Sequence, residues 1–121
     1  MRPSFLAVAV CVISIAGVQG AEARHRRANG DDIGGRPSQW CGWWMRTQLG
    51  GGPEMNLAAN WRSWGSRASG PQVGAVVVWP HHVGLITGQS SNGKWIVKSG
   101  NDGGAVRERV RSVSGAVFRL G

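Results

Sequence analysis

The sequence predicts a small α+β domain in which N-terminal helices pack on an antiparallel β-sheet. The helical patterns of this 121-residue chain precede residue 66, and the strand patterns follow residue 72. The 20 glycines are more than twice the usual share of about 7%, which opposes long helices and favours short strands and tight turns. The seven tryptophans need buried surroundings, so a fully disordered chain is excluded.

Residues 1–23 have the pattern of a secretory signal peptide. Arg2 supplies a positive start, and residues 5–18 form a nearly unbroken apolar run that is short for a membrane span of about 20 residues. Small residues then place the cleavage after Gly20 or after Ala23. An uncleaved membrane anchor is the alternative. We expect a secreted or periplasmic protein with no stable membrane insertion after cleavage.

The mature chain is expected to contain a polar linker, residues 24–32, and one folded domain, residues 33–121. The net charge is +8, and it stays +8 after cleavage because the signal peptide carries one Arg and one Glu. A basic exported protein can meet cell-wall polymers, lipid head groups or nucleic acid. The arginines are dispersed and no recognition-helix or zinc-finger pattern is present, so nucleic-acid binding is not expected.

The first helix is expected to start after Ser38 and to stop at the glycines of residues 50–52. Pro37 disfavours an earlier helix, and Ser38 is a good N-cap residue. Cys41 would then be the third helical residue, in the first turn.

Cys41 is the candidate nucleophile. Cys11 leaves with the signal peptide, and a single cysteine in an exported chain indicates intermolecular pairing or a reactive thiol; a buried inert cysteine is the alternative. Cys41 shares the face toward the protein body with Met45 and Leu49, whereas Arg46 points elsewhere. The positive end of the helix dipole is expected to lower the pKa of the thiol. The unpaired N–H groups at the helix start are expected to receive an oxyanion.

A second helix is expected between Asn56, a possible cap, and Gly65, which stops it. Leu57, Trp61 and Trp64 follow helical spacing. This stripe is therefore expected to belong to the core.

Strands are expected in the second half of the chain, where apolar and β-branched residues gather. Pro80 interrupts the first two, and residues 90–93 form a turn. The expected strands are residues 73–79, 83–88, 94–98, 105–113 and 116–120.

A reactive thiol needs a base, and the mature chain offers His25, His81 and His82. His25 is discounted because it lies in the expected linker. Neighbouring residues in a strand point to opposite faces, so only one of His81 and His82 can meet Asn101; His81 is the competing base. Zinc bound by Cys41, His81 and His82 is disfavoured for the same reason, and no CxxC or HxxxH spacing supports it. No metal or cofactor is expected.

The pairing of the expected strands brings His82 close to Asn101. If residues 90–93 form a four-residue loop, His82 faces Asn101. If a two-residue turn forms instead, His82 faces Gly103, and Asn101 lies two positions away on the same face. Both registers place an amide side chain beside the imidazole, as a Cys–His–Asn site of thiol, base and orienting group requires. A hydrogen-bonded pair with a purely structural role is the alternative.

These residues belong to a series of ordered motifs. The motifs are Trp-Cys-Gly-Trp-Trp at 40–44, Asn-Trp-Arg-Ser-Trp-Gly at 60–65, three valines at 76–78, His-Val-Gly-Leu-Ile at 82–86 and Gly-Asn-Asp at 100–102. In this order, the chain resembles the CHAP family (cysteine, histidine-dependent amidohydrolases and peptidases) and the related NlpC-type cell-wall peptidases. The resemblance spans residues 37–121.

The resemblance implies a papain-like fold and a catalytic domain over residues 33–121. Cys41 matches the nucleophile, His82 the base, and Asn101 the polar third residue. The implied activity is hydrolysis of amide bonds in peptidoglycan, by an amidase or an endopeptidase, with peptidoglycan or another anionic cell-wall polymer as partner and a monomeric enzyme. The domain is short for the family, and it carries no separate wall-binding repeat. The alternative function is a non-catalytic, cationic cell-wall-binding module with the same fold.

Overall fold

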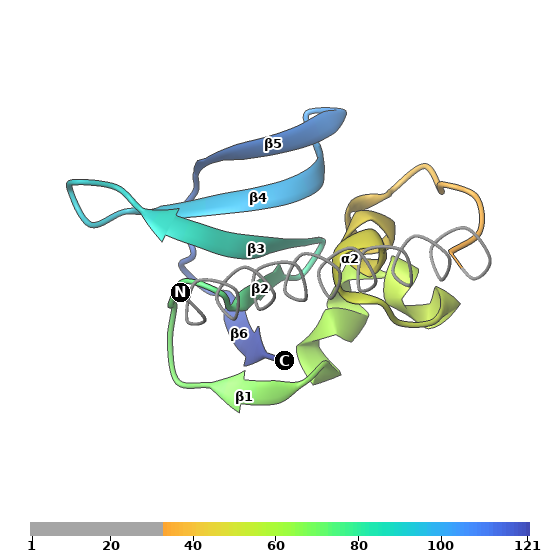
Figure 1. The fold of residues 1–121 in the computed structure, drawn as a ribbon, viewed down its shortest axis with the longest axis horizontal. Coiled ribbons are helices and arrows are strands. Elements are labelled where there is room, and N and C mark those ends of the chain that lie inside the picture. Colours follow the sequence, from red (N-terminus) through yellow and green to blue (C-terminus); the bar gives the residue numbers. More distant parts are fainter. Residues whose placement is uncertain (1–32) are drawn as a thin grey trace, which may run out of the picture.

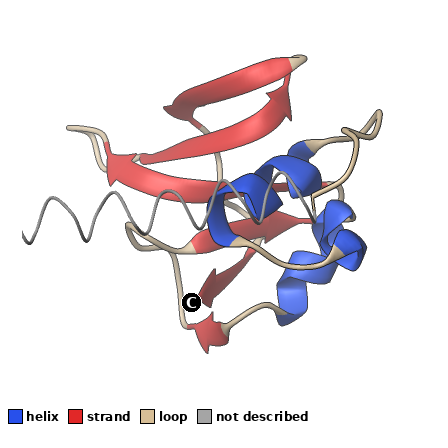
Figure 2. Ribbon diagram, turned by 45° about the vertical axis from the view of Figure 1, so that its right-hand side comes forward, coloured by secondary structure: helices blue, strands red, loops and turns tan. Residues whose placement is uncertain are grey.

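A computed structural model of the chain describes residues 33–121. These residues form an α+β structure in which helical segments pack beside an antiparallel sheet (Figures 1 and 2). The expected signal peptide, residues 1–23, and the expected linker, residues 24–32, lie outside the described residues. Within the described part, no helix is long and apolar enough to cross a membrane.

The first helix, α2 (Cys41–Leu49), begins later than expected. Its N-cap residue is Trp40, and no side chain caps it. The expectation of a Ser38 cap is therefore wrong, and Cys41 is the first helical residue instead of the third. Trp40 is buried in the core, so the residue before the helix is held by packing and not by a side-chain cap.

The expected second helix consists of two 3₁₀ segments, η1 (Pro53–Asn56) and η2 (Ala58–Ser63). Leu57 between them has an extended backbone and is 59% exposed. The expectation that Leu57 belongs to the core is wrong because the helical spacing is broken there. Trp61 is fully buried, as expected; its Nε1 donates to the carbonyl of Met55, and its ring lies 5.5 Å from that of Trp64.

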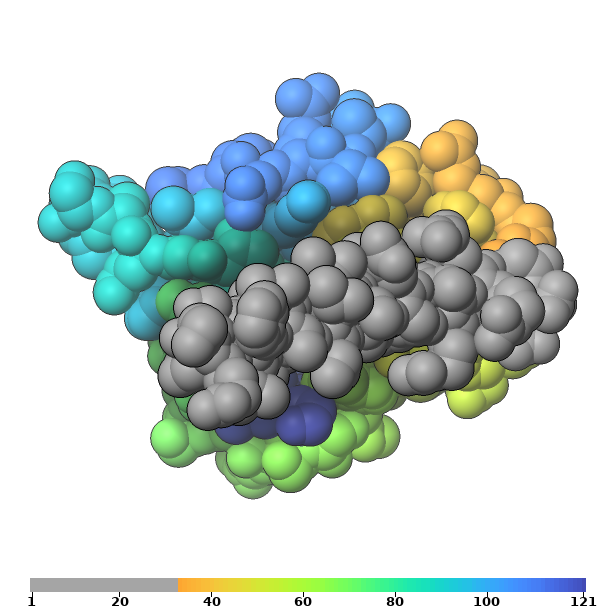
Figure 3. All heavy atoms as spheres, viewed as in Figure 1, coloured from red at the N-terminus to blue at the C-terminus, as the bar shows by residue number. Residues whose placement is uncertain are grey.

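The sheet has six strands among the described residues, in the order β1-β6-β2-β3-β4-β5. The strands are β1 (Ser66–Ala68), β2 (Val76–Trp79), β3 (His82–Gln89), β4 (Trp95–Asp102), β5 (Ala105–Val110) and β6 (Val117–Leu120). The five expected strands are confirmed with shifted ends. The short strand β1 was not expected, because two of its three residues are polar and exposed. The turn between β3 and β4, in cyan, projects from the body in Figures 1 and 3.

The two faces of the sheet contribute to two separate apolar clusters. Val76 and Val78 pack with α2, η1 and η2, whereas Val77 packs in the second cluster with Ile86 and Val97. This division follows from the alternation of side chains along β2. The larger cluster, which includes Cys41, holds the helical layer on the sheet.

Arg46 lies inside the protein, so the expectation that it points elsewhere is wrong. It is 1% exposed, whereas Leu49, expected to face the protein body, is 38% exposed. Nε of Arg46 donates to the carbonyl of Gly51, and Nη1 of Arg46 donates to the carbonyl of Ile33 and to Oδ1 of Asn56. The buried guanidinium therefore holds together three segments around α2.

Two glycines allow α2 to approach neighbouring backbone closely. A Cβ added at Gly42 would lie 2.5 Å from the carbonyl oxygen of Met55 and 2.3 Å from that of Asn56. A Cβ at Gly100 in β4 would lie 2.4 Å from Cβ of Trp44. The start of α2 is thus held between η1 and β4 with no space for a side chain at either position.

We expect Gly42→Ala to destabilise the protein by about 1–3 kcal/mol, because the added methyl group collides with backbone that cannot move aside alone. Gly35→Ala is the matched control, since a Cβ there has no atom within 4 Å and its φ is not positive. The measurement is the free energy of unfolding in urea. Equal stability of the two variants would contradict the close packing of α2 on η1.

Candidate active site

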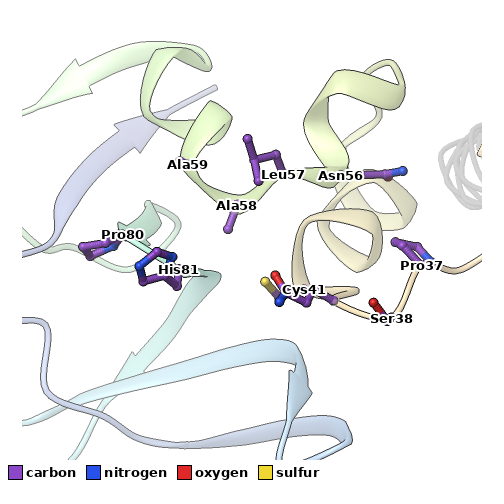
Figure 4. A pocket seen from close by; sticks show the side chains of 10 residues that line it. Pro37, Ser38, Cys41, Asn56, Leu57, Ala58, Ala59, Pro80 and His81 are labelled. Atoms are coloured by element: carbon purple, nitrogen blue, oxygen red, sulfur yellow. The ribbon is translucent and has the colours of Figure 1, made fainter.

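Cys41 stands at the N-terminus of α2 and lines an open pocket of about 310 Å³. The residue is 5% exposed, and its sulfur points toward the space between α2 and the β2–β3 turn (Figure 4). The rest of the pocket is formed by the loop before α2, by the η1–η2 junction and by that turn, which contribute residues 37–39, 56–59 and 80–81. A small substrate group can therefore reach the sulfur from solvent.

The two candidate bases take different places at the β2–β3 turn. His81 is exposed and lines the pocket beside Cys41 (Figure 4). His82 is half-buried as the first residue of β3, where it pairs with Trp79. The Nε2 atom of His82 lies 2.9 Å from Oγ of Ser99.

The thiol of Cys41 lies against the beginning of β3. The backbone of Val83, the residue after His82, lies close enough to the Cys41 sulfur to oppose the rise of the thiol pKa on burial. The backbones of Gly42 and Cys41 act in the same direction. The structure thus brings the start of α2 to the start of the strand that carries His82.

The amide of Asn101 is not the hydrogen-bond partner of His82. The structure has the four-residue-loop register near this end of the sheet, since Leu85 pairs with Lys98. Asn101, however, has a φ of 54°, and the β4–β5 register shifts between Ser99 and Asp102. Within residues 33–121, no hydrogen bond joins the Asn101 side chain to His82.

Gly84 explains why His82 contacts Ser99 and not Asn101. Ser99 follows Lys98, which pairs with Leu85, and a Cβ at Gly84 would lie 3.0 Å from Cβ of Ser99. Because Gly84 has no side chain, the imidazole of His82 can reach the Ser99 hydroxyl diagonally across the strands. The glycine two residues after His82 was the sequence signal for this diagonal contact.

An ion-pair network near His82 was also not predicted from the sequence. The buried carboxylate of Asp102 accepts two hydrogen bonds from Arg109, both 2.7 Å long, and lies 3.7 Å from Arg111. The guanidinium of Arg111 lies 4.9 Å from the ring centre of Trp79, which is itself 5.7 Å from the ring of His82. The network therefore holds the ring of Trp79, which lies beside the imidazole, in place.

Burial determines the protonation of both reactive groups. It raises the pKa of the Cys41 thiol above its ordinary value, against the opposing hydrogen bonds from backbone and the charge of Arg111. The expectation of a lowered thiol pKa is therefore wrong for the free protein. Burial, helped by the charge of Arg111 and opposed by Asp102, lowers the pKa of His82 to about 4. At neutral pH the site consequently holds an uncharged thiol and an uncharged imidazole.

This arrangement offers a candidate nucleophile on an open pocket and a neutral imidazole at the start of β3, the strand whose beginning lies against that nucleophile. The pocket itself is lined by His81 and not by His82. Among residues 33–121, no group of three His, Cys, Asp or Glu side chains is placed to hold a metal ion. Comparison of the chain with protein-family models, with curated proteins and with solved structures finds no match.

We expect alkylation of Cys41 by iodoacetamide to rise with pH, with a midpoint above the ordinary thiol value of about 8.5, because burial disfavours the thiolate. The measurement is the alkylation rate between pH 5 and 10 in protein that lacks residues 1–23. The same protein in denaturant is the control and should titrate near the ordinary value. A rate that is already maximal below pH 7 would instead indicate a preformed thiolate–imidazolium pair.

Proposed function

We propose that this chain is an exported cysteine hydrolase with a papain-like fold that cleaves amide bonds in peptidoglycan. One observation supports the chemistry above all others. Cys41 lies at a helix N-terminus on an open pocket, and its sulfur is close to the backbone of Val83, directly after His82. The layer of helical segments that precedes an antiparallel sheet supports the papain-like arrangement.

In this proposal His82 is the base and Ser99 is a positioning residue. When the imidazole carries its proton on Nε2, that proton is donated to Oγ of Ser99. The other ring nitrogen, Nδ1, is then unprotonated and free to accept a proton. Ser99 takes the orienting role that the sequence had suggested for Asn101.

The reaction begins with an uncharged pair, so the proton moves as the bond forms. Nδ1 of His82 takes the thiol proton while the sulfur of Cys41 attacks the amide carbonyl. The resulting imidazolium gives its proton to the leaving amine, and a thioester remains on Cys41. His82 then takes a proton from water, the hydroxide attacks the thioester, and the acid leaves with the thiol restored.

The first turn of α2 supplies donors for the oxyanion. The amide of Trp44 is the first to donate within the helix, to the carbonyl of Trp40, so earlier amides have no intrahelical acceptor. The amides of Cys41 and Gly42 lie at the sulfur. They are thus placed to receive negative charge on the attacked carbonyl oxygen.

The apolar lining of the Cys41 pocket and the positive net charge of the chain favour a substrate in which a small apolar group is attached to an anionic polymer. Pro37, Leu57 and Ala58 give the pocket apolar walls, and the exposed side chain of Leu57 extends its rim. The net charge of +8 favours residence on a negatively charged cell wall.

A non-catalytic wall-binding module with the same fold is the second candidate. The uncharged thiol favours it, because a neutral sulfur is the weaker nucleophile. The two candidates differ in turnover, whereas both predict binding to the wall.

Cys41→Ser is expected to reduce the release of soluble fragments from purified peptidoglycan by about a thousandfold or more, because a hydroxyl is a far weaker nucleophile in this site. Ser91→Ala, in the exposed β3–β4 turn, is the control and should keep full activity. Co-sedimentation with peptidoglycan should be unchanged in both variants. Equal release by the wild type and Cys41→Ser would refute the enzyme and leave the binding module.

Ser99→Ala is expected to lower kcat by about 10- to 100-fold, since the imidazole loses the partner that orients it. Asn101→Gly is the comparison, because glycine keeps the positive φ and removes the amide. It should retain most of the activity. The pH profile separates positioning from folding: the acidic limb of kcat/KM should move in Ser99→Ala and not in Asn101→Gly. The reverse result would assign the orienting role to Asn101.

A further inference from the structure

A second hollow lies where η2, β1 and β6 meet, and it is lined by three arginines. Its volume is about 370 Å³, and its charged residues are Arg62, Arg67 and Arg119. It shares no lining residue with the Cys41 pocket. In Figure 3 the green segment of η2 and β1 and the dark blue strand β6 lie together at the lower edge of the molecule.

Two of these arginines face each other across adjacent strands. Arg67 of β1 pairs directly with Arg119 of β6, so their side chains emerge on the same face of the sheet. Like charges at directly opposed positions destabilise a sheet. An anion bound between the two guanidinium groups would reduce such repulsion.

Within residues 33–121, no carboxylate lies within ion-pair distance of these three arginines. Asp102 forms an ion pair with Arg109. Glu108 belongs to β5, at the opposite edge of the sheet from β1. Glu54 lies beside Gly52. Within residues 33–121, the side chains of Arg62 and Arg67 take part in no ion pair or hydrogen bond.

Arg119 is held in place before any ligand arrives. Its Nε donates to the carbonyl of Trp64 at 2.7 Å, and its Nη2 donates to the carbonyl of Gly65 at 3.0 Å. The remaining N–H groups of this guanidinium are free to donate elsewhere, and an oriented donor loses less entropy when it binds a ligand.

We propose that this pocket binds a phosphate group, carried by an anionic polymer or by a small phosphorylated molecule. Three guanidinium groups suit a tetrahedral anion with several acceptor oxygens better than a carboxylate with two. The hollow is larger than one phosphate group and open, which leaves space for the groups esterified to it. The site goes beyond the proposed hydrolase, because it involves none of the residues around Cys41.

The test is the thermal unfolding midpoint during titration with inorganic phosphate at constant ionic strength. Phosphate should raise the midpoint of the wild-type protein. In Arg67→Gln, the midpoint without phosphate should be equal to or higher than that of the wild type, because the like-charge contact is gone. In this variant, the phosphate concentration that gives half of the maximum rise in the unfolding midpoint should increase about tenfold or more, because a charged hydrogen-bond donor is lost.

Lys98→Gln is the charge-matched control, because Lys98 is exposed on β4, away from the hollow, and the variant has the same net charge as Arg67→Gln. It should keep the phosphate response, as should Cys41→Ser, whereas Arg62→Gln should weaken it. Equal loss in Lys98→Gln and Arg67→Gln would overturn the proposal, as would an equal shift with acetate. A lower midpoint for Arg67→Gln with an unchanged phosphate response would overturn it too.

Linear polyphosphate distinguishes the two sources of the phosphate group. Binding that is tighter per phosphate than that of inorganic phosphate supports a polymer, because neighbouring groups raise the local concentration. Equal binding supports a small phosphorylated ligand. In both cases the affinity should fall as salt is added, and a response to polyphosphate that survives in Arg67→Gln would place the polymer on another surface.

Discussion

Close backbone packing around the start of α2 is the constraint on which the rest of the candidate site depends. Gly42 lies against the carbonyls of η1, and Gly100 of β4 lies against Trp44. Because neither position has space for a side chain, the first turn of α2 is held between two elements from distant parts of the sequence. The sulfur of Cys41 consequently meets the backbone at the start of β3, where His82 begins the strand.

Burial and the helix terminus act on the Cys41 thiol in opposite directions, and burial prevails. A helix N-terminus stabilises a nearby negative charge by about 0.3–1 kcal/mol at an exposed site, whereas removing a charged group from water costs several times more. The same desolvation keeps His82 neutral. In the proposed reaction, the base is therefore already uncharged at neutral pH, and the thiolate forms only during the attack.

The positive charge of the domain is organised in two different ways. Near His82, Arg109 and Arg111 surround the buried carboxylate of Asp102 and form part of the wall behind the imidazole. At the far edge of the sheet, Arg67 faces Arg119, and no carboxylate within residues 33–121 forms an ion pair with either. In the first arrangement one carboxylate pairs with both arginines, whereas in the second Arg119 is held by backbone carbonyls and a bound anion would add stability.

The sequence by itself determined the local elements: an α+β order, a cysteine at a helix start, a histidine at a strand start and two possible registers of β3 against β4, one of which the structure has near Leu85. Such features follow from residue spacing and turn chemistry within a few positions. Only the tertiary structure decided that Ser99 contacts His82, that Arg46 is buried, that Leu57 is exposed and that the pKa of Cys41 is raised. Gly84 marks the place of the His82–Ser99 contact in the sequence, but all these properties depend on which distant segments pack together and how much water they exclude, and residue spacing within a few positions does not specify that.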